Sequence, residues 1–169
     1  GNDKPDLRIP FELTDVSEFF TDESKTGFGI FAKITNGGGK VIAIPAPKAD
    51  TTQSRKFFDN MDKWAKKEMQ APGLGYARIK NDVDTIADGQ GGHIVLPDDG
   101  TRKGIYSPDP VLKNFQPDHL KAFLKKMNLG PGDGVFFSAG KKGDAYKLAG
   151  AARNKVAADL DLIPEGTFK

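Results

Sequence analysis

Gly134-Val135-Phe136-Phe137-Ser138-Ala139-Gly140-Lys141-Lys142-Gly143-Asp144 is the stretch that decides the fold. Residues 135–139 are continuously apolar and of strand length, which predicts a buried strand. Asp144 is expected to cap a helix that follows the Gly/Lys turn. Apolar residues of that helix recur at every fourth position: Leu148, Ala152, Val156 and Leu160. A buried strand followed by an amphipathic helix indicates a sheet covered by helices.

Two Ile- and Phe-rich runs nearer the N-terminus, residues 28–34 and 41–44, flank Asn36-Gly37-Gly38-Gly39. Because Asn and Gly tolerate the positive φ of tight turns, the pattern predicts a β-hairpin. Pro45 and Pro47 are expected to end its second strand, since proline lacks the N–H that a ladder needs.

Further elements follow from hydrophobic periodicity. A helix is predicted over residues 53–70 and a second from Pro117, with strand 74–79 between them. Asp15 and Glu18 have the spacing of a capping box, which predicts a short helix through Phe20. The stripe of the second helix is Leu120, Phe123, Leu124 and Met127.

The predicted order is strand, strand, helix, strand, insert, helix, strand, helix. The helices can pack on one face of a mainly antiparallel sheet, so the predicted class is α+β, a two-layer α/β sandwich. The insert, residues 81–110, is expected to form either an appended hairpin or a mobile excursion. The hairpin would pair residues 93–96 with 104–106 around Asp98-Asp99-Gly100.

Composition excludes several classes of protein. The 169 residues suit one domain, and 25 basic against 23 acidic residues exclude a disordered polyelectrolyte. A pI of 8.7 is too mild to indicate nucleic-acid binding by itself. The absence of cysteine excludes a disulfide, a thiolate nucleophile and Cys-ligated zinc, and it fits a reducing cytosol. No apolar run approaches the ~18 residues of a membrane span, so no membrane association is expected.

Catalytic patterns are not found. His93 and His119 are the two imidazoles, and no Gly-x-Ser-x-Gly elbow accompanies them. Asp82 with Asp84, and Asp98 with Asp99, fit turns better than a cation loop. The sequence therefore predicts no catalytic, cofactor-binding or metal-ligating residue.

Residues 140–144 leave two interpretations open. A strand, a Gly/Lys turn and a helix start can hold a phosphate through helix N–H groups. A Walker A loop does not fit, because five residues separate Gly134 from Gly140 where four are needed, and Lys142 occupies the Ser/Thr position. The alternatives are a simple strand-to-helix turn and a free-standing phosphate- or nucleotide-binding module.

Four segments together resemble one family in its own order. They are residues 3–8 with 12–16, residues 73–80 (Gly-Leu-Gly-Tyr-Ala-Arg-Ile-Lys), residues 132–139 (Gly-Asp-Gly-Val-Phe-Phe-Ser-Ala) and residues 150–160 (Gly-Ala-Ala-Arg-Asn-Lys-Val-Ala-Ala-Asp-Leu). The last two are similar to Gly-Asp-x-Ile-Phe-Phe-Gly-Ala and Gly-Ala-Leu-Arg-x-Lys-Val-Gly-x-Asp-Leu of bacterial-type aspartyl-tRNA synthetases. Residues 82–110 depart from the family, whose link is shorter.

The resemblance implies an excised GAD insertion domain, which the family shares with the B subunit of the tRNA-dependent amidotransferase. Its fold is a β(2)-α-β(2)-α sandwich of DCoH-like type, here with an extra helix and a long insert. Residues 1–27 would lead in from the parent catalytic domain through a short helix. Residues 28–160 would form the GAD domain, and residues 161–169 would return to the catalytic domain.

The parent implied by the resemblance is a cytoplasmic, homodimeric class II ligase in protein biosynthesis. It activates aspartate with ATP and Mg²⁺ and esterifies tRNA-Asp, or both tRNA-Asp and tRNA-Asn. The motifs for ATP, aspartate and the anticodon lie outside this stretch, so the domain itself is expected to be a non-catalytic monomer without a cofactor. Its expected partners are tRNA and the parent catalytic domain.

Two roles for the domain are compatible with the resemblance: a tRNA-facing domain and a purely structural appendage. For the first, the candidate tRNA phosphate contacts are Lys141, Lys142, Arg153 and Lys155. The simpler interpretation places the first two in a helix-start turn and the last two on a solvated helix face.

Overall fold

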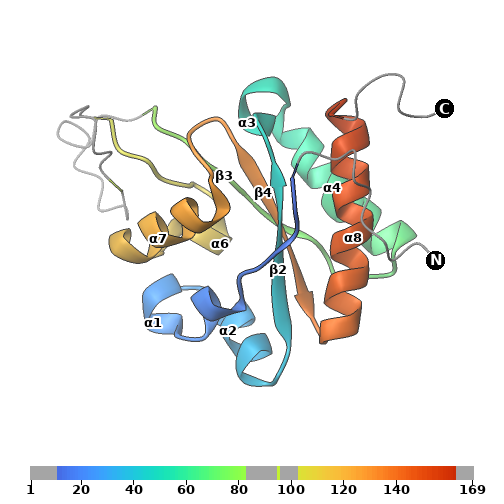
Figure 1. The fold of residues 1–169 in the computed structure, drawn as a ribbon, viewed down its shortest axis with the longest axis horizontal. Helices are drawn as coiled ribbons and strands as arrows, with labels where there is room; N and C mark the ends of the chain where they lie inside the picture. Colours follow the sequence, from blue (N-terminus) through green and yellow to red (C-terminus); the bar gives the residue numbers. More distant parts are fainter. Residues whose placement is uncertain (1–10, 83–94, 96–102, 163–169) are drawn as a thin grey trace.

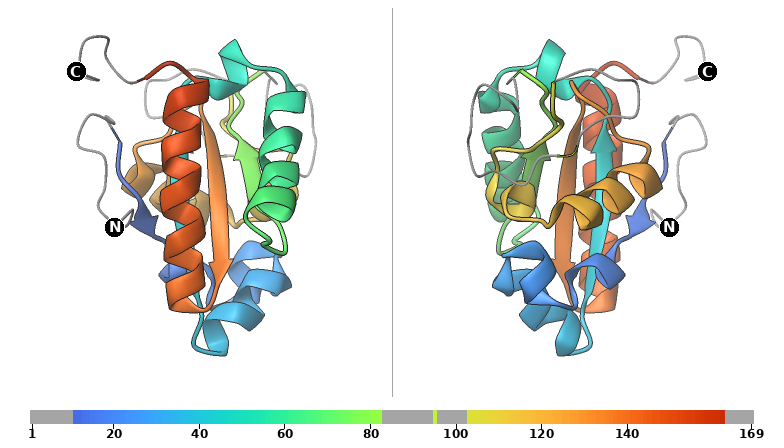
Figure 2. Two further views of the ribbon diagram at one scale, coloured as in Figure 1. Left: turned by 90° about the vertical axis from the view of Figure 1, so that its right-hand side faces the viewer. Right: turned by 90° about the vertical axis from the view of Figure 1, so that its left-hand side faces the viewer.

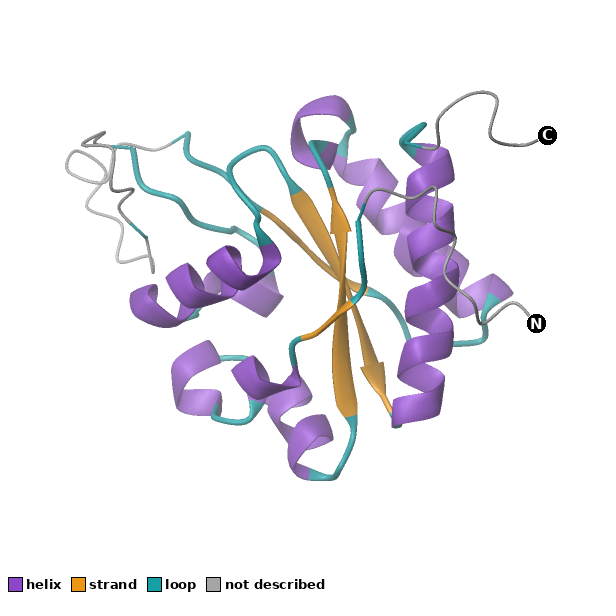
Figure 3. Cartoon of the chain, in the orientation of Figure 1, coloured by secondary structure: helices purple, strands orange, loops and turns teal. Residues whose placement is uncertain are grey.

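The computed structural model describes residues 11–82, 95 and 103–162, and within these ranges it contains one four-stranded sheet (Figures 1 and 3). The strands are β1 (Thr14–Asp15), β2 (Lys40–Ala46), β3 (Gly75–Arg78) and β4 (Gly134–Gly140). Their order is β1-β2-β4-β3, and every neighbouring pair is antiparallel. The continuously apolar stretch is thus the inner strand β4, as predicted.

Helices cover both faces of this sheet. The described helices are the 3-10 helix η1 (Ser17–Phe20), α1 (Glu23–Thr26), α2 (Gly29–Asn36), α3 (Ala49–Thr52), α4 (Arg55–Glu68), α6 (Pro110–Lys113), α7 (Pro117–Met127) and α8 (Lys142–Asp159). Figure 2 shows α4 and α8 on one face, with α2, α6 and α7 on the other.

The α+β class with an antiparallel sheet is confirmed, and α4 and α8 with the sheet form the two expected layers. The expectation that all the long helices share one face is wrong, because α7 packs on the opposite side. The apolar stripe of α7 was predicted correctly, but a stripe does not specify which face of a sheet it covers.

The face toward α4 and α8 is built from alternate strand residues. Ile42 and Ile44 of β2 and Phe136 of β4 are fully buried there, against side chains of both helices. The helical partners are Phe58, Met61, Ala65, Leu148, Ala152 and Val156. Because successive strand residues point to opposite faces, the intervening residues of β2 and β4 supply the second core.

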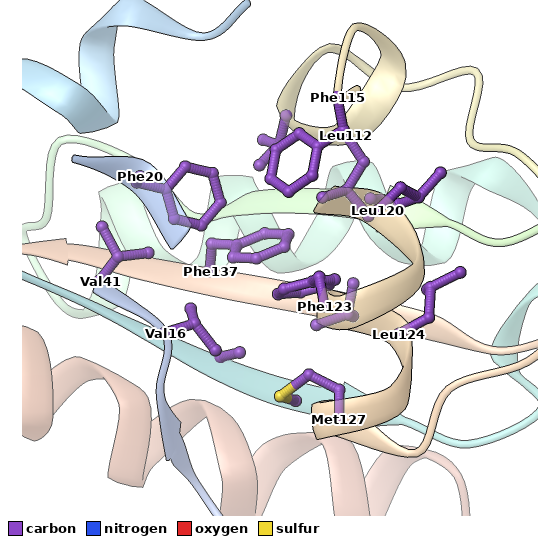
Figure 4. Packing of buried hydrophobic residues seen from close by; sticks show 14 of the residues in the cluster. Val16, Phe20, Val41, Leu112, Phe115, Leu120, Phe123, Leu124, Met127 and Phe137 are labelled. Carbon is purple, nitrogen blue, oxygen red and sulfur yellow. The ribbon is translucent and has the colours of Figure 1, made fainter. Parts of the chain in front are cut away.

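The second core is rich in phenylalanine (Figure 4). Phe137 of β4 lies at its centre: its ring centroid is 5.8 Å from that of Phe20 and 5.9 Å from that of Phe123. Phe115 contacts both neighbours, at 5.4 and 5.9 Å. Burial of both faces of β4 is the physical reason why residues 135–137 are all apolar.

The predicted hairpin over residues 28–44 is wrong in its first half. Residues 29–36 form helix α2, and only the second run is a strand. Gly38 has φ +90°, its N–H donates to the Thr35 carbonyl, and the Gly39 N–H donates to the Ile34 carbonyl at 2.8 Å. These bonds form a Schellman motif, so the glycines end a helix rather than turn a hairpin. A short apolar run fits either period, which is why the prediction failed.

Two helix starts also differ from the prediction. Lys141 is the N-cap of α8, and Asp144 lies in its first turn without capping it. The short helix before Thr21 is present as η1, but Asp15 accepts from the Ser17 N–H and hydroxyl, while Glu18 pairs with Lys126. Acidic residues in a first turn are stabilised by the helix dipole whether or not they cap it.

The remaining elements agree more closely. Strand β3 and helix α4 lie within the predicted ranges, although the short α3 precedes α4. The expected end of β2 at Pro45 is wrong: the strand continues to Ala46, directly before Pro47. Pro45 faces Val135 of β4, beyond Ile42 and Ala43, which pair with β1, so its missing N–H lies where β1 no longer pairs with β2. Val95 and Ile105 form an antiparallel bridge with hydrogen bonds of 2.9 and 2.7 Å, as the appended hairpin requires. His93 and residues 98–100 lie outside the described residues.

Candidate functional site

The start of α8 presents Lys141 and Lys142 to solvent. The chain enters the turn at Gly140 with φ +147°, and the Ala145 N–H donates to the Lys141 carbonyl at 2.8 Å. Two ammonium groups beside a helix N-terminus are suited to binding an anion. The carboxylate of Asp144 in the same turn would repel that anion.

Arg153 takes no part in that cluster. Its side chain is buried, at 5% exposure, and its Nε donates to the carbonyl oxygen of Phe11 at 3.0 Å. The guanidinium carbon lies 6.0 Å from the Phe11 ring centroid. The interpretation of Arg153 as part of a solvated face is therefore wrong: this residue holds the segment before β1 against α8.

Lys155 is half-buried near the other end of α8. Its Nζ is 3.0 Å from Asp159 Oδ2 and 5.8 Å from the centroid of the Trp64 ring on α4. Since an α-helix rises ~1.5 Å per residue, Lys155 lies ~20 Å along the axis from Lys142. The structure thus separates the four predicted residues into an exposed pair, a buried arginine and a lysine between two helices.

Lys155 forms part of the wall of a groove between α4 and α8. The groove has a volume of about 460 Å³. It is lined by Gln53, Ser54, Lys56, Phe57, Asn60, Met61, Trp64, Lys155 and Asp159. Sequence reasoning assigned Phe57 and Trp64 to the core, yet both are only half-buried. The sequence did contain a signal for this partial exposure. Phe57 and Trp64 are seven residues apart and lie beside polar positions 53, 56 and 60, which places the two rings at the edge of the buried face of α4.

A buried ion pair joins β3 to the end of the insert. Arg78 donates from Nε to Asp109 Oδ2 at 3.0 Å and from Nη2 to Oδ1 at 2.9 Å, and its backbone N–H donates to Oδ2 at 2.7 Å. The hydrogen bond to Asp109 raises the pKa of Arg78. Every partner of this pair belongs to the scaffold, so its role is structural, and no sequence pattern paired these two residues.

Asp133 organises the turn before β4. Its Oδ1 accepts from the Lys48 N–H at 2.8 Å, and its Oδ2 accepts from the Gly130 N–H at 2.9 Å. Its carbonyl accepts from the Ile79 N–H at 2.9 Å. The Gly-Asp start of the segment at residues 132–139 is therefore explained by turn geometry, without a ligand.

His119 is held by the second core. Its Nε2 lies 2.7 Å from the Phe19 carbonyl oxygen, and its ring packs between those of Phe19 and Phe115. In the described part of the chain, no three His, Cys, Asp or Glu side chains form a group able to hold a metal ion. Among the same residues, no helix has the length and apolarity needed to cross a membrane.

Comparison with known proteins assigns this arrangement to a family. The family model described as "GAD domain" matches residues 31–149, which is most of the chain. The chain belongs to the GAD domain family. The resemblance found in the sequence is thereby confirmed, and the mixed sheet-and-helix architecture is consistent with a GAD-like fold.

Relatives of this GAD domain match it along its whole length. The chain is 44% identical over 169 residues to an aspartate–tRNA(Asp/Asn) ligase of Zymomonas mobilis, covering all of this chain and 24% of the relative. It is 43% identical to the ligase of the same name from Erythrobacter litoralis, covering 23% of that protein. The 169-residue chain thus spans about a quarter of the length of these ligases. Neither comparison supports a free-standing nucleotide module at residues 140–144.

Proposed function

We propose that this GAD domain is a non-catalytic, tRNA-facing insertion domain of an aspartate–tRNA ligase. The observation that carries the proposal is the match of the whole chain, at 38–44% identity, to ligases whose names specify tRNA(Asp/Asn). The parent would ligate aspartate to tRNA-Asp, and to tRNA-Asn as those names indicate, using ATP and Mg²⁺ in the cytoplasm as a homodimer.

Within this proposal, residues 28–160 form the domain and the flanking segments connect it to the catalytic domain, with β1 and Phe20 of the leading segment packed on the domain. The described residues contain two hydrophobic cores and structural ion pairs, and the carboxylates of Asp109 and Asp133 accept hydrogen bonds from backbone N–H groups of the scaffold. An accessory role suits this distribution, because catalysis needs polar groups that converge on a site other than their own scaffold.

Phosphate contact is the physical basis proposed for tRNA binding. Exposed lysines attract a nucleic-acid backbone and release its counterions, so binding weakens steeply with salt. Lys141 and Lys142 have the required exposure. Arg153 acts indirectly, through the placement of Phe11, and Lys155 contributes from the α4–α8 groove.

The test is a titration of the 169-residue chain with tRNA-Asp and an unrelated tRNA across a salt series. Changing Lys141 and Lys142 to Gln is expected to lower the salt slope by about 2, or about 1 for each phosphate contact. Lys125→Gln, which removes one exposed lysine on α7, is the control for loss of a surface charge away from α8. Equal tRNA affinities of the wild type and the double variant would show that these two lysines do not contact tRNA. No tRNA binding at low salt would favour a structural appendage.

A further inference from the structure

The α4–α8 groove combines aromatic and cationic side chains, whereas the start of α8 offers the lysines alone. Phe57 and Trp64 are one heptad apart on α4, and both line the groove while remaining half-buried. Polar atoms are supplied by Gln53, Ser54 and Asn60. Planar rings with hydrogen-bonding groups around them can receive a flat, polar ligand such as a nucleobase.

A row of basic side chains runs beside these rings. Lys56, Asn60, Lys63 and Lys67 recur at i, i+4, i+7 and i+11, so they lie on one stripe of α4, and all four are exposed. The aromatic positions 57 and 64 lie next to this stripe around the helix. Two residues of this stripe, Lys56 and Asn60, line the groove, and Lys63 and Lys67 continue the stripe along α4. Figure 2 shows α4 and α8, which carry the groove, side by side over the sheet.

Two of the three acidic residues of α4 are engaged elsewhere, and the third, Glu68, is exposed at the end of the helix. Asp62 pairs with Lys66 at 3.0 Å and accepts from the Leu74 N–H, and Asp59 accepts from the Tyr76 hydroxyl at 3.3 Å. Both contacts point toward β3 rather than toward the groove. The acidic group in the groove lining is Asp159, against Lys56 and Lys155. The groove and its bordering stripe therefore favour a polyanion.

Lys155 shows what the face of the Trp64 ring accepts. Its Nζ lies 5.8 Å from the indole centroid, a cation–π arrangement. A base stacked on the indole would need that space, and the flexible stem of Lys155 lets the ammonium move toward a phosphate. Such a move would replace both the contact with the indole and the 3.0 Å ion pair with Asp159.

We infer that the α4–α8 groove binds an unpaired nucleotide of RNA, with its base stacked on Trp64 and its flanking phosphates against Lys56, Lys63 and Lys67. The inference rests on the proposed function, because it names the part of a tRNA that this domain contacts. Paired RNA presents phosphates but no open base face, so a single-stranded segment is the specific occupant.

Trp64 is the single tryptophan of the chain, so its emission reports directly on the groove. The probes are a six-nucleotide oligoadenylate, tRNA-Asp, the same tRNA with its unpaired 3′ end removed, and polyglutamate as an acidic polypeptide. Stacking is expected to quench the emission with the same Kd that a binding titration gives. Trp64→Ala is expected to weaken oligoadenylate binding about tenfold, within the range measured for stacking on one aromatic residue.

Two further variants keep the test independent of folding. Changing Lys56, Lys63 and Lys67 to Gln alters exposed positions only and is expected to reduce affinity and salt slope together. Lys125→Gln, on the opposite face, is expected to change neither. Thermal unfolding of each variant verifies that it is folded.

The possible outcomes distinguish a failure of the groove inference from a failure of the proposed function. Binding of tRNA without quenching, and with equal affinity for Trp64→Ala, would overturn the groove and leave the proposed function standing. No binding of any RNA would overturn both. If polyglutamate quenched the emission as strongly as oligoadenylate, the groove would be a site for acidic peptides, and the inference that it binds a nucleotide would be wrong. Loss of quenching after removal of the 3′ end would support the inference and identify the occupant.

Discussion

Arg78 and Asp109 are 31 residues apart in the chain and meet through two parallel side-chain hydrogen bonds of 3.0 and 2.9 Å. The Asp109 side chain is 5% exposed and that of Arg78 is 16% exposed, so water screens the pair poorly. Asp109 is also the N-cap residue of α6, at the point where the insert returns to the domain. The carboxylate thus joins the edge strand β3 to the residue at which the insert ends and α6 begins.

Removal of this carboxylate should destabilise the domain strongly. Asp109→Ala leaves the Arg78 guanidinium buried without its charge partner, and breaking such a pair costs about 3–5 kcal/mol of the free energy of unfolding. Urea denaturation measures the loss. The double variant Arg78→Met with Asp109→Leu is the control, expected to recover part of the stability, because it leaves no charge unpaired but still removes the acceptor of the residue 78 N–H. A loss below about 1 kcal/mol for Asp109→Ala would contradict the role assigned to the pair.

Asp133 gives a second stability prediction. Asp133→Ala removes the acceptors of the Lys48 and Gly130 N–H groups, and at ~1 kcal/mol per hydrogen bond the expected loss is about 2 kcal/mol. Asp118→Ala is the control: Asp118 is exposed in the first turn of α7, and its loss is expected to cost less than about 1 kcal/mol. Equal effects of the two substitutions would mean that the turn before β4 does not depend on this side chain.

The end of α2 can be tested with two glycines. Gly38→Ala places a Cβ at φ +90° and is expected to cost about 1 kcal/mol, whereas Gly150→Ala within α8 is expected to add about 0.5–1 kcal/mol. A Cβ at either position meets no atom within 4 Å, so backbone conformation alone separates the two. Urea unfolding of both variants measures the difference. If Gly38→Ala were as favourable as Gly150→Ala, the Schellman motif would be the wrong description.

The secondary structure was predictable from the sequence in some elements and not in others. β4, the stripe of α7 and strand β3 were predictable because burial imposes a period of 2 or 3.6 over a whole element. The run at residues 28–34 is too short to distinguish those periods, and the glycines after it suit a turn as well as a helix cap. The contact that decides between them, the packing of Phe31 against the second core, is 106 residues distant in the chain at Phe137.

The candidate site was predictable in the same uneven way. The exposure of Lys141 and Lys142 follows from a polar turn between a strand and a helix. The burial of Arg153 does not, because it depends on where the segment around Phe11 lies. The α4–α8 groove depends on two helices separated by more than 70 residues of chain, so no local pattern shows that Trp64 meets Lys155.

Asp15 provides a prediction for acid conditions. Burial of Asp15 on its own raises the pKa of the carboxyl, but hydrogen bonds from the Ser17 hydroxyl and N–H outweigh it, together with Lys40 at 3.4 Å, so the pKa lies below the ordinary value. A carboxyl whose pKa is lower in the folded state stabilises the fold fully above its unfolded pKa. That contribution is lost as the pH falls from about 4 through the folded pKa.

Ser17→Ala should therefore raise the pKa of Asp15, measured by NMR titration of its carboxyl carbon. Since the Ser17 hydroxyl also accepts from the Val41 N–H at 2.9 Å, the variant is expected to be less stable by about 1–2 kcal/mol at neutral pH as well. Lys40→Gln separates the effects, because it removes the charge near Asp15 and leaves the Val41 bond intact. It should also raise the pKa of Asp15, because Lys40 lowers that pKa through a hydrogen bond and through its charge. An Asp15 carboxyl that titrates at the same pH in wild type and both variants would show that its ionisation does not depend on these contacts.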